Sequence, residues 1–206
     1  MKKEFISYNA VRNNALKLAH LIYHDGFTPD VIYVSLRGGA YIGNVISEYF
    51  KAVRTTARPV YYAAVVARSY MDVRETEKIM IEGWTYAPEH LRVGDKVLLV
   101  DDIFDSGNTI NVLADIILAK GIPRHDLKVA VHDYKYFYDK SEQLPIQPDY
   151  WCRKHELSLQ DEDTWIHYMS HELIGLSTQE LEDYYFSHDP ELRHIIGMIN
   201  EDRRGL

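Results

Sequence analysis

Cysteine is nearly absent from this sequence, in which Cys152 is the single example. One thiol cannot form an internal disulfide and cannot build a cysteine-rich zinc site. A lone cysteine is more typical of a small packing residue than of a nucleophile. Disulfide-based stabilisation and thiol redox chemistry are therefore not predicted.

Long apolar runs are also missing. No stretch of about 18 apolar residues, the length that a membrane helix needs, occurs anywhere in the chain. The first residues, Met1 to Phe5, lack the apolar segment of a signal peptide. With 46% hydrophobic and 26% charged residues, the composition is that of an ordinary globular protein. We expect a cytoplasmic protein without a membrane partner.

Positive charge is in deficit, since the formal net charge is -8 at pH 7. Proteins that bind nucleic acid draw affinity from clustered lysine and arginine, so no nucleic-acid partner is predicted. A small anion is compatible with this charge, because one phosphate needs only a few backbone N–H groups and at most a single cation.

Some segments carry apolar residues at helical spacing and others are short apolar runs typical of strands, and the two kinds of segment alternate along the chain. Such alternation favours an α/β fold, with a mainly parallel sheet flanked by helices and joined by right-handed crossovers. The predicted helices cover residues 8–24, 41–50 and 109–120, and the predicted strands cover residues 31–34, 59–66, 97–100 and 127–131.

Two segments depart from this alternation. Residues 68–92 are mostly polar with no clear period, which predicts a long loop or a mobile hairpin. After residue 140 the pattern changes to prolines, aromatics and short extended pieces, and Ser177 to Glu180 has the sequence of a capping box that opens a helix. We therefore expect a core at residues 1–140 and a small C-terminal hood with a helical appendage at residues 141–206.

The strongest functional pattern is the apolar strand at 97–100, followed by Asp101, Asp102 and a small polar turn that opens a helix. Ligands of α/β proteins bind at the carboxyl ends of parallel strands, and a helix N-terminus offers N–H groups to a phosphate. Paired carboxylates there can accept hydrogen bonds from hydroxyls and help to hold a metal through oxygen. Each feature alone is compatible with a plain strand and helix cap, but together they favour function.

A receiver domain also places paired aspartates at a strand end. Its pair would lie near the start of the domain, with a phosphorylatable aspartate on a later strand. Here the pair lies in the middle of the chain, and the later strand is followed by residues 132–135, His-Asp-Tyr-Lys. The receiver interpretation therefore fits poorly.

The run at 97–109 resembles the phosphoribosyl pyrophosphate signature of type I phosphoribosyltransferases. The resemblance extends over roughly residues 8 to 172 and is nearest to enzymes for 6-oxopurines. It implies that Asp101 and Asp102 contact the ribose hydroxyls and Mg²⁺, and that Asp105 acts as the base near purine N7. It also implies a 5-phosphate cradle formed by Ser106, Gly107, Asn108 and Thr109. Relatives often carry Gly or Lys where Asn108 stands, a change that a backbone cradle should tolerate.

Further segments fit the same resemblance. The loop at 35–39 is similar to the pyrophosphate loop of these enzymes, which implies substrate contacts and a non-proline cis peptide at Leu36-Arg37. Ser69 and Tyr70 resemble the start of the catalytic lid. Lys135 would contact the oxygen at purine C6, Trp165 would stack on the base, and Ile166 would offer main-chain contacts. The remaining implied contacts are Gly38 for pyrophosphate and, one residue later than in relatives, Glu172 for the metal.

We therefore predict an enzyme of purine salvage, a homo-oligomer (dimer or tetramer), that uses phosphoribosyl pyrophosphate, Mg²⁺ and hypoxanthine, guanine or xanthine. Two alternatives stay open. One is a regulator that senses phosphoribosyl pyrophosphate on the same fold, against which the acidic charge stands. The other is an acceptor that is a pyrimidine or adenine, against which Lys135 and Trp165 stand, since a cation favours a carbonyl oxygen over an amino group.

Overall fold

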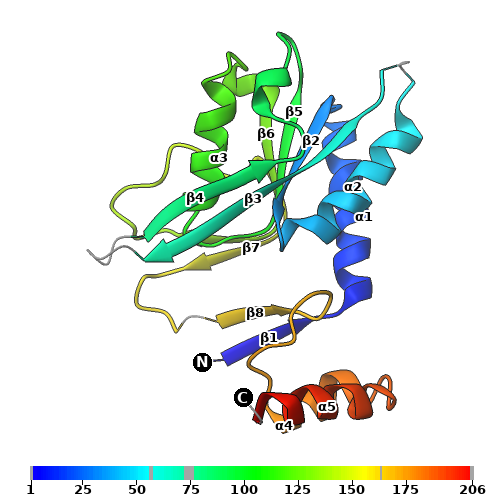
Figure 1. Cartoon of the computed structure of the whole chain (residues 1–206). Coiled ribbons are helices and arrows are strands. Elements are labelled where there is room, and N and C mark those ends of the chain that lie inside the picture. The colour runs from blue at the N-terminus through cyan, green and yellow to red at the C-terminus, as the bar shows by residue number, and fades with distance from the viewer. Residues whose placement is uncertain (1, 56–57, 72–76, 163, 205–206) are drawn as a thin grey trace. The chain divides into compact units, whose positions relative to one another are not determined.

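The computed structural model describes residues 2–55, 58–71, 77–162 and 164–204, and the chain divides into two compact units (Figure 1). The larger unit is Tyr8–Asp163. The smaller unit combines Met1–Ser7 with Thr164–Leu206, so it contains both ends of the chain.

A six-stranded sheet with the order β4-β3-β2-β5-β6-β7 forms the centre of the larger unit. All neighbouring strands are parallel except β3 and β4. This arrangement confirms the predicted α/β class. The strands are β2 (Val31–Leu36), β3 (Tyr61–Met71), β4 (Glu77–Trp84), β5 (Val97–Phe104), β6 (Leu127–Phe137) and β7 (Tyr150–Leu157).

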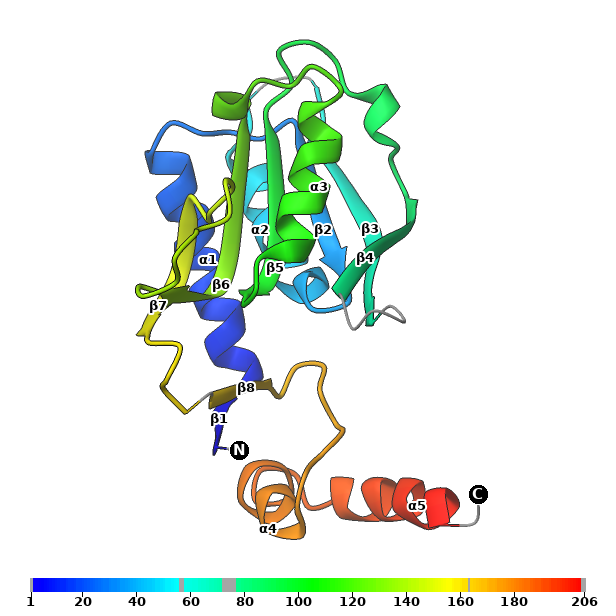
Figure 2. The same cartoon turned by 90° about the vertical axis from the view of Figure 1, so that its left-hand side faces the viewer.

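Helices cover both faces of this sheet. Figure 2 shows α3 (Asn108–Leu118) in front of the sheet, and α1 (Tyr8–His24) and α2 (Gly39–Val53) behind it. The four residues 97–100 at the start of β5 are fully buried between these layers. The apolar run that predicted this strand is therefore explained by burial on both faces. Short 3₁₀ helices occupy Pro88–His90 and Arg124–Asp126.

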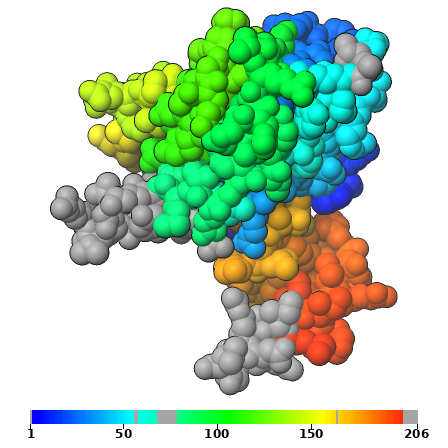
Figure 3. Space-filling view, turned by 45° about the horizontal axis from the view of Figure 1, so that its top comes forward, coloured from blue at the N-terminus to red at the C-terminus, as the bar shows by residue number. Residues whose placement is uncertain are grey.

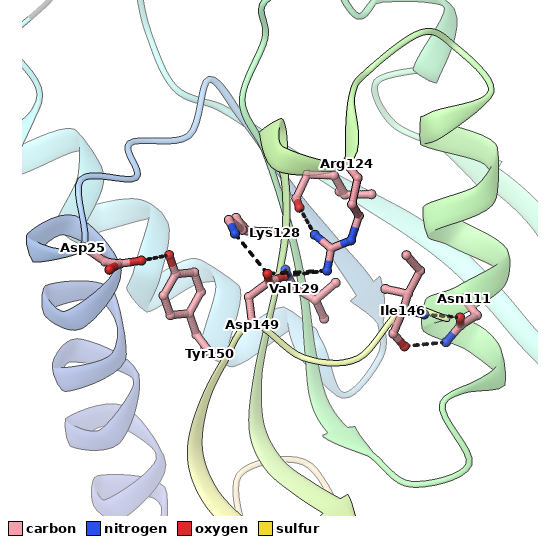
Figure 4. Close-up of polar contacts among 9 residues, drawn as sticks. Asp25, Asn111, Arg124, Lys128, Val129, Ile146, Asp149 and Tyr150 are labelled. Carbon is pink, nitrogen blue, oxygen red and sulfur yellow. Dashed lines mark hydrogen bonds and ion pairs between the residues drawn. The ribbon is translucent and has the colours of Figure 1, made fainter. Parts of the chain in front are cut away.

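The edge strand β7 is fastened at its start by polar contacts (Figure 4). The Asp149 carboxylate accepts hydrogen bonds from Arg124 (3.2 Å), Lys128 (3.1 Å) and the backbone N–H of Val129 (2.9 Å), and Tyr150 donates to Asp25 (2.6 Å). Because β7 pairs with β6 throughout, it belongs to the main sheet. The domain boundary expected at residue 140 thus lies inside the larger unit, whose end is at Asp163.

The first part of the polar segment at 68–92 belongs to the antiparallel pair of β3 and β4. Of the two predicted forms, a long loop and a hairpin, the structure therefore has the hairpin. The register shifts between Val66 and Ala67, which marks a β-bulge. In the space-filling view, β4 and the segment that follows it lie at the surface toward the viewer (Figure 3). Met80 on β4 is 48% exposed, as expected for an edge strand.

The smaller unit is built on a parallel pair of β1 (Lys2–Ile6) and β8 (Thr164–Tyr168). The predicted capping box is confirmed, because Ser177 accepts from the N–H of Glu180 while the Glu180 carboxylate accepts from the N–H of Ser177. The helical part consists of α4 (Thr178–Leu181), a π-helical turn at Glu182–Phe186 and α5 (Leu192–Arg204). None of the helices in the described ranges is both long and apolar enough to cross a bilayer.

An ion pair at the start of β5 leads to a prediction on stability. Asp95 is 1% exposed and accepts from Arg58 (2.6 Å) and from the N–H of Arg92 (2.9 Å). Burial acts to raise the pKa of Asp95, but these hydrogen bonds outweigh it and hold the pKa below its ordinary value. We expect Asp95→Asn to lower the free energy of unfolding by about 2 kcal/mol at pH 7, since charged hydrogen bonds are weakened.

The sign of the pH dependence follows from the lowered pKa. The Asp95 contribution is fully present above the unfolded-state pKa near 3.8 and is lost as the pH falls through the lower folded-state value. Urea unfolding of wild type and variant should therefore differ at pH 7 and converge at acid pH. Asp115→Asn, at an exposed position of α3, is the control. A difference that is unchanged at acid pH would contradict the assignment.

Candidate active site

The paired acids lie within β5, which continues to Phe104 rather than ending at Val100 as predicted. The Asp101 carboxyl is buried, and this burial together with the neighbouring charge of Asp102 raises its pKa well above the ordinary value. One oxygen of Asp101 accepts from the N–H of Asp102 (3.0 Å). A buried acid beside a second acid favours a cationic or hydroxyl ligand, because such a ligand would relieve the repulsion between them.

The turn after β5 is tight and leads directly into α3. Gly107 has a φ of 80°, which glycine adopts easily, and it directly precedes α3. A Cβ at this position would lie 2.2 Å from the ring of Phe104, so only glycine lets the turn pack this closely. The first N–H groups of a helix have no partner within the helix, and Ser106 and Thr109 add hydroxyls beside them.

Asn111 fixes this turn and was not singled out from the sequence. Its side-chain amide donates to the carbonyl of Gly107 (3.0 Å). Figure 4 shows its two bonds to Ile146, in which the amide donates to the carbonyl (2.9 Å) and the amide oxygen accepts from the N–H (3.0 Å). The side chain is 7% exposed. A polar residue on the otherwise apolar face of the predicted helix 109–120 was the available signal, because a buried amide requires partners.

The loop after β2 lies against the acids. The peptide bond Leu36-Arg37 is cis, as predicted. A Cβ on Gly38 would lie 2.1 Å from a carboxylate oxygen of Asp102, and one on Gly39 would lie 2.6 Å from the carbonyl oxygen of Val100. The loop predicted to bind pyrophosphate therefore lies beside the acids predicted to contact the ribose. A cavity of about 510 Å³ is lined by Leu36, Arg37, Val66 and Ala67.

Lys135 and Asp105 come together at the same end of the sheet. Lys135 lies within β6, which runs on to Phe137, and its side chain is 5% exposed. Its ammonium lies 3.5 Å from the carboxylate of Asp105, whose side chain is 55% exposed. The residues predicted to read the base and to manage its proton are thus adjacent.

The remaining predicted residues are distributed as follows. Ser69 and Tyr70 lie on β3 opposite Ile79 and Lys78 of β4, while their side chains lie outside the described part of the structure. Trp165 and Ile166 lie on β8 of the smaller unit, where Trp165 is 46% exposed and Ile166 is buried.

Glu172 belongs to the smaller unit as well, and protein donors occupy both of its carboxylate oxygens. The indole N–H of Trp165 donates to Oε2 (3.0 Å), and the N–H of Tyr168 donates to Oε1 (3.1 Å). A carboxylate with these contacts is poorly suited to the metal role that the resemblance implied. No cluster of three or more His, Cys, Asp and Glu side chains suited to a metal occurs in the described ranges.

Comparison with known families shows to which family this chain belongs. Residues 7–160 match the phosphoribosyl transferase domain, and this match includes both loops, the paired acids and Lys135. The chain is a type I phosphoribosyltransferase. The segment that carries Trp165 and Glu172 lies beyond the matched residues.

Individual relatives of this phosphoribosyltransferase are distant. A bifunctional protein PyrR of Halalkalibacterium halodurans is 26% identical over 154 residues, which are 73% of this chain and 82% of that protein. A purine phosphoribosyltransferase from Pyrococcus horikoshii has a TM-score of 0.63 at 21% identity, covering 86% of this chain and 99% of the other. A hypothetical protein from Neisseria gonorrhoeae with bound ppGpp has a TM-score of 0.62 at 22% identity, covering 84% and 92%. At these identities the structural likeness shows the fold.

Proposed function

We propose that this phosphoribosyltransferase transfers the 5-phosphoribosyl group of phosphoribosyl pyrophosphate to a 6-oxopurine, releasing pyrophosphate and a nucleoside monophosphate. The observation that carries the proposal is the buried Lys135 beside Asp105. A lysine ammonium has three donors and no acceptor, so it matches a carbonyl oxygen at C6 and not an amino group. The purine phosphoribosyltransferase from Pyrococcus horikoshii, similar in fold, is in keeping with a purine acceptor.

In the proposed reaction, a purine nitrogen attacks C1 of the ribose as pyrophosphate departs. The turn at Ser106–Thr109 holds the 5-phosphate through backbone N–H groups, which fixes C1 in line with the nitrogen. Asp105 accepts the proton that the base loses, and Lys135, 3.5 Å from the Asp105 carboxylate, holds the C6 oxygen. The chain's contribution is positioning and electrostatics, with no covalent intermediate.

Arg37 and a divalent cation would offset the charge that develops on the leaving group. Asp101 and Asp102 offer carboxylate oxygens, which suit Mg²⁺, and the substrate's own oxygens would complete its coordination. When bound, Mg²⁺ would supply charge neutralisation at the pyrophosphate. For Trp165 and Ile166, stacking and main-chain contact with the base are the proposed roles.

One observation supports a second candidate function. The relative from Halalkalibacterium halodurans is called bifunctional, so a second role beside transfer is a candidate, and we propose sensing of phosphoribosyl pyrophosphate as that role. The net charge of -8 weighs against a nucleic-acid partner for such a role.

The test is to incubate the pure protein with phosphoribosyl pyrophosphate, Mg²⁺ and separately hypoxanthine, guanine, xanthine, adenine, uracil and orotate, and to follow nucleotide formation. We expect products from at least one 6-oxopurine and not from adenine or the pyrimidines. Binding of phosphoribosyl pyrophosphate without any product would favour the sensing role. Turnover of adenine in preference to the 6-oxopurines would overturn the proposed specificity.

A further inference from the structure

The smaller unit contains a hydrogen-bond network around the side chain of Trp165. Trp165 is the first large residue of β8, and nearly half of its surface is exposed, whereas Ile166, His167 and Tyr168 after it are buried. An exposed indole on an ordered strand offers a flat face to a ligand. The ring has one polar group, its N–H, and that group donates to Glu172 Oε2 at 3.0 Å.

Glu172 is itself held at three points. Its second carboxylate oxygen accepts from the N–H of Tyr168 (3.1 Å), its own N–H donates to the carbonyl of Tyr168 (3.0 Å), and its carbonyl accepts from the Tyr185 hydroxyl (3.0 Å). Hydrogen bonds with Tyr168 and Tyr185 therefore fix both the backbone and the side chain of Glu172. A carboxylate fixed in this way can orient the group to which it is bonded.

His167 is bonded to this network through Tyr185 and lies beside the Glu172 carboxylate. The Tyr185 hydroxyl donates its hydrogen bond to the backbone carbonyl of Glu172, so it accepts one from Nε2 of His167 at 2.8 Å. The Nδ1 atom of the neutral ring then carries a lone pair, and it lies 3.5 Å from Glu172 Oε2 without a hydrogen-bond partner among the described residues. The histidine thus leaves Oε2 free to accept from the indole of Trp165.

We infer that Glu172 is a positioning residue that fixes the Trp165 indole for stacking on the purine, an inference that rests on the proposed function. It replaces the metal role for this residue. Because a charged hydrogen bond holds one edge of the ring, the indole is ordered before the base arrives, and less conformational freedom is lost on binding. Glu172 would then affect the affinity for the base and not that for phosphoribosyl pyrophosphate or Mg²⁺.

The test is a double-mutant cycle with Glu172→Ala and Trp165→Phe, the second of which keeps a ring but removes the indole N–H. We expect Glu172→Ala to raise KM for the purine about tenfold, with KM for phosphoribosyl pyrophosphate and the Mg²⁺ dependence unchanged. In the Trp165→Phe background, Glu172→Ala should have little further effect, because the bond is already missing. Glu191→Ala, at an exposed position of the same unit, is the control.

A readout independent of turnover comes from tryptophan fluorescence. The difference between wild type and Trp165→Phe isolates the emission of Trp165 from that of Trp84 and Trp151. Its quenching by acrylamide should rise in Glu172→Ala, since the ring has lost its tether, and Glu172→Gln should restore part of the protection. Unchanged quenching, additive effects on KM or a shifted Mg²⁺ dependence would each overturn the inference. If wild type used no base at all, the proposed function would fail separately from this result.

Discussion

Gly38→Ala is expected to remove about 10²-fold of kcat/KM while leaving the protein folded. The backbone of Gly38 is in the right-handed helical region, with a φ of -58° and a ψ of -46°, so alanine fits the conformation without strain. The obstacle is space, because the new Cβ would lie 2.1 Å from a carboxylate oxygen of Asp102. Either the loop or the acid must move by an ångström or more, and such a displacement at a reacting site commonly costs this much.

The measurement is steady-state kinetics with phosphoribosyl pyrophosphate as the varied substrate, beside a thermal unfolding curve. Gly83→Ala on β4 is the matched control, since a Cβ there meets nothing within 4 Å. Wild-type kinetics in Gly38→Ala would show that the contact between this loop and Asp102 has no bearing on catalysis. A large loss of stability would show that the contact serves folding instead.

Lys135→Met should lower kcat/KM for 6-oxopurines by about 10²-fold and reduce their advantage over adenine. Methionine keeps an unbranched side chain in a site where Lys135 is 5% exposed, so packing is largely preserved. The lost group is the cation that faces Asp105 and, in the proposed reaction, the C6 oxygen. Sites that read a substrate through one buried polar group lose discrimination strongly when that group is removed.

The informative quantity is the ratio of kcat/KM values for hypoxanthine and adenine, measured in wild type, Lys135→Met and the exposed control Lys140→Met. A reduced ratio supports direct recognition of the purine. If activity fell equally with every base, Lys135 would act through Asp105 alone. An unaltered ratio together with unaltered rates would remove the basis for the 6-oxopurine preference.

Much of the fold could be predicted because burial and strand periodicity coincide in this chain. The apolar run at 97–100 is buried between two helical layers, and the helix predicted at 8–24 matches α1. The ends of β5 and β6 were missed by several residues. Asp101, Asp102 and Lys135 are polar, yet they lie on strands. The strand β5 pairs with β6 as far as Phe104, and β6 pairs with β7 as far as Phe137.

The candidate site was predictable where one local run supplies all the residues, as in the turn after β5. Contacts between distant segments were not. Asn111 meets Ile146 across 35 positions, and no periodicity signals such a pair. Glu172 was the nearest acid to the expected place, one residue late, and its two donors, Trp165 and Tyr168, come from the fold of its own unit.

The hydrogen bonds of Asn111 have a consequence for how an anion would be received. They tie the turn after β5 to a segment that leads into the edge strand, so the turn cannot rearrange by itself. The backbone N–H groups of the turn are therefore oriented when the chain folds, before any anion binds. The entropic cost of ordering them is met once, at folding, and does not recur in each catalytic cycle.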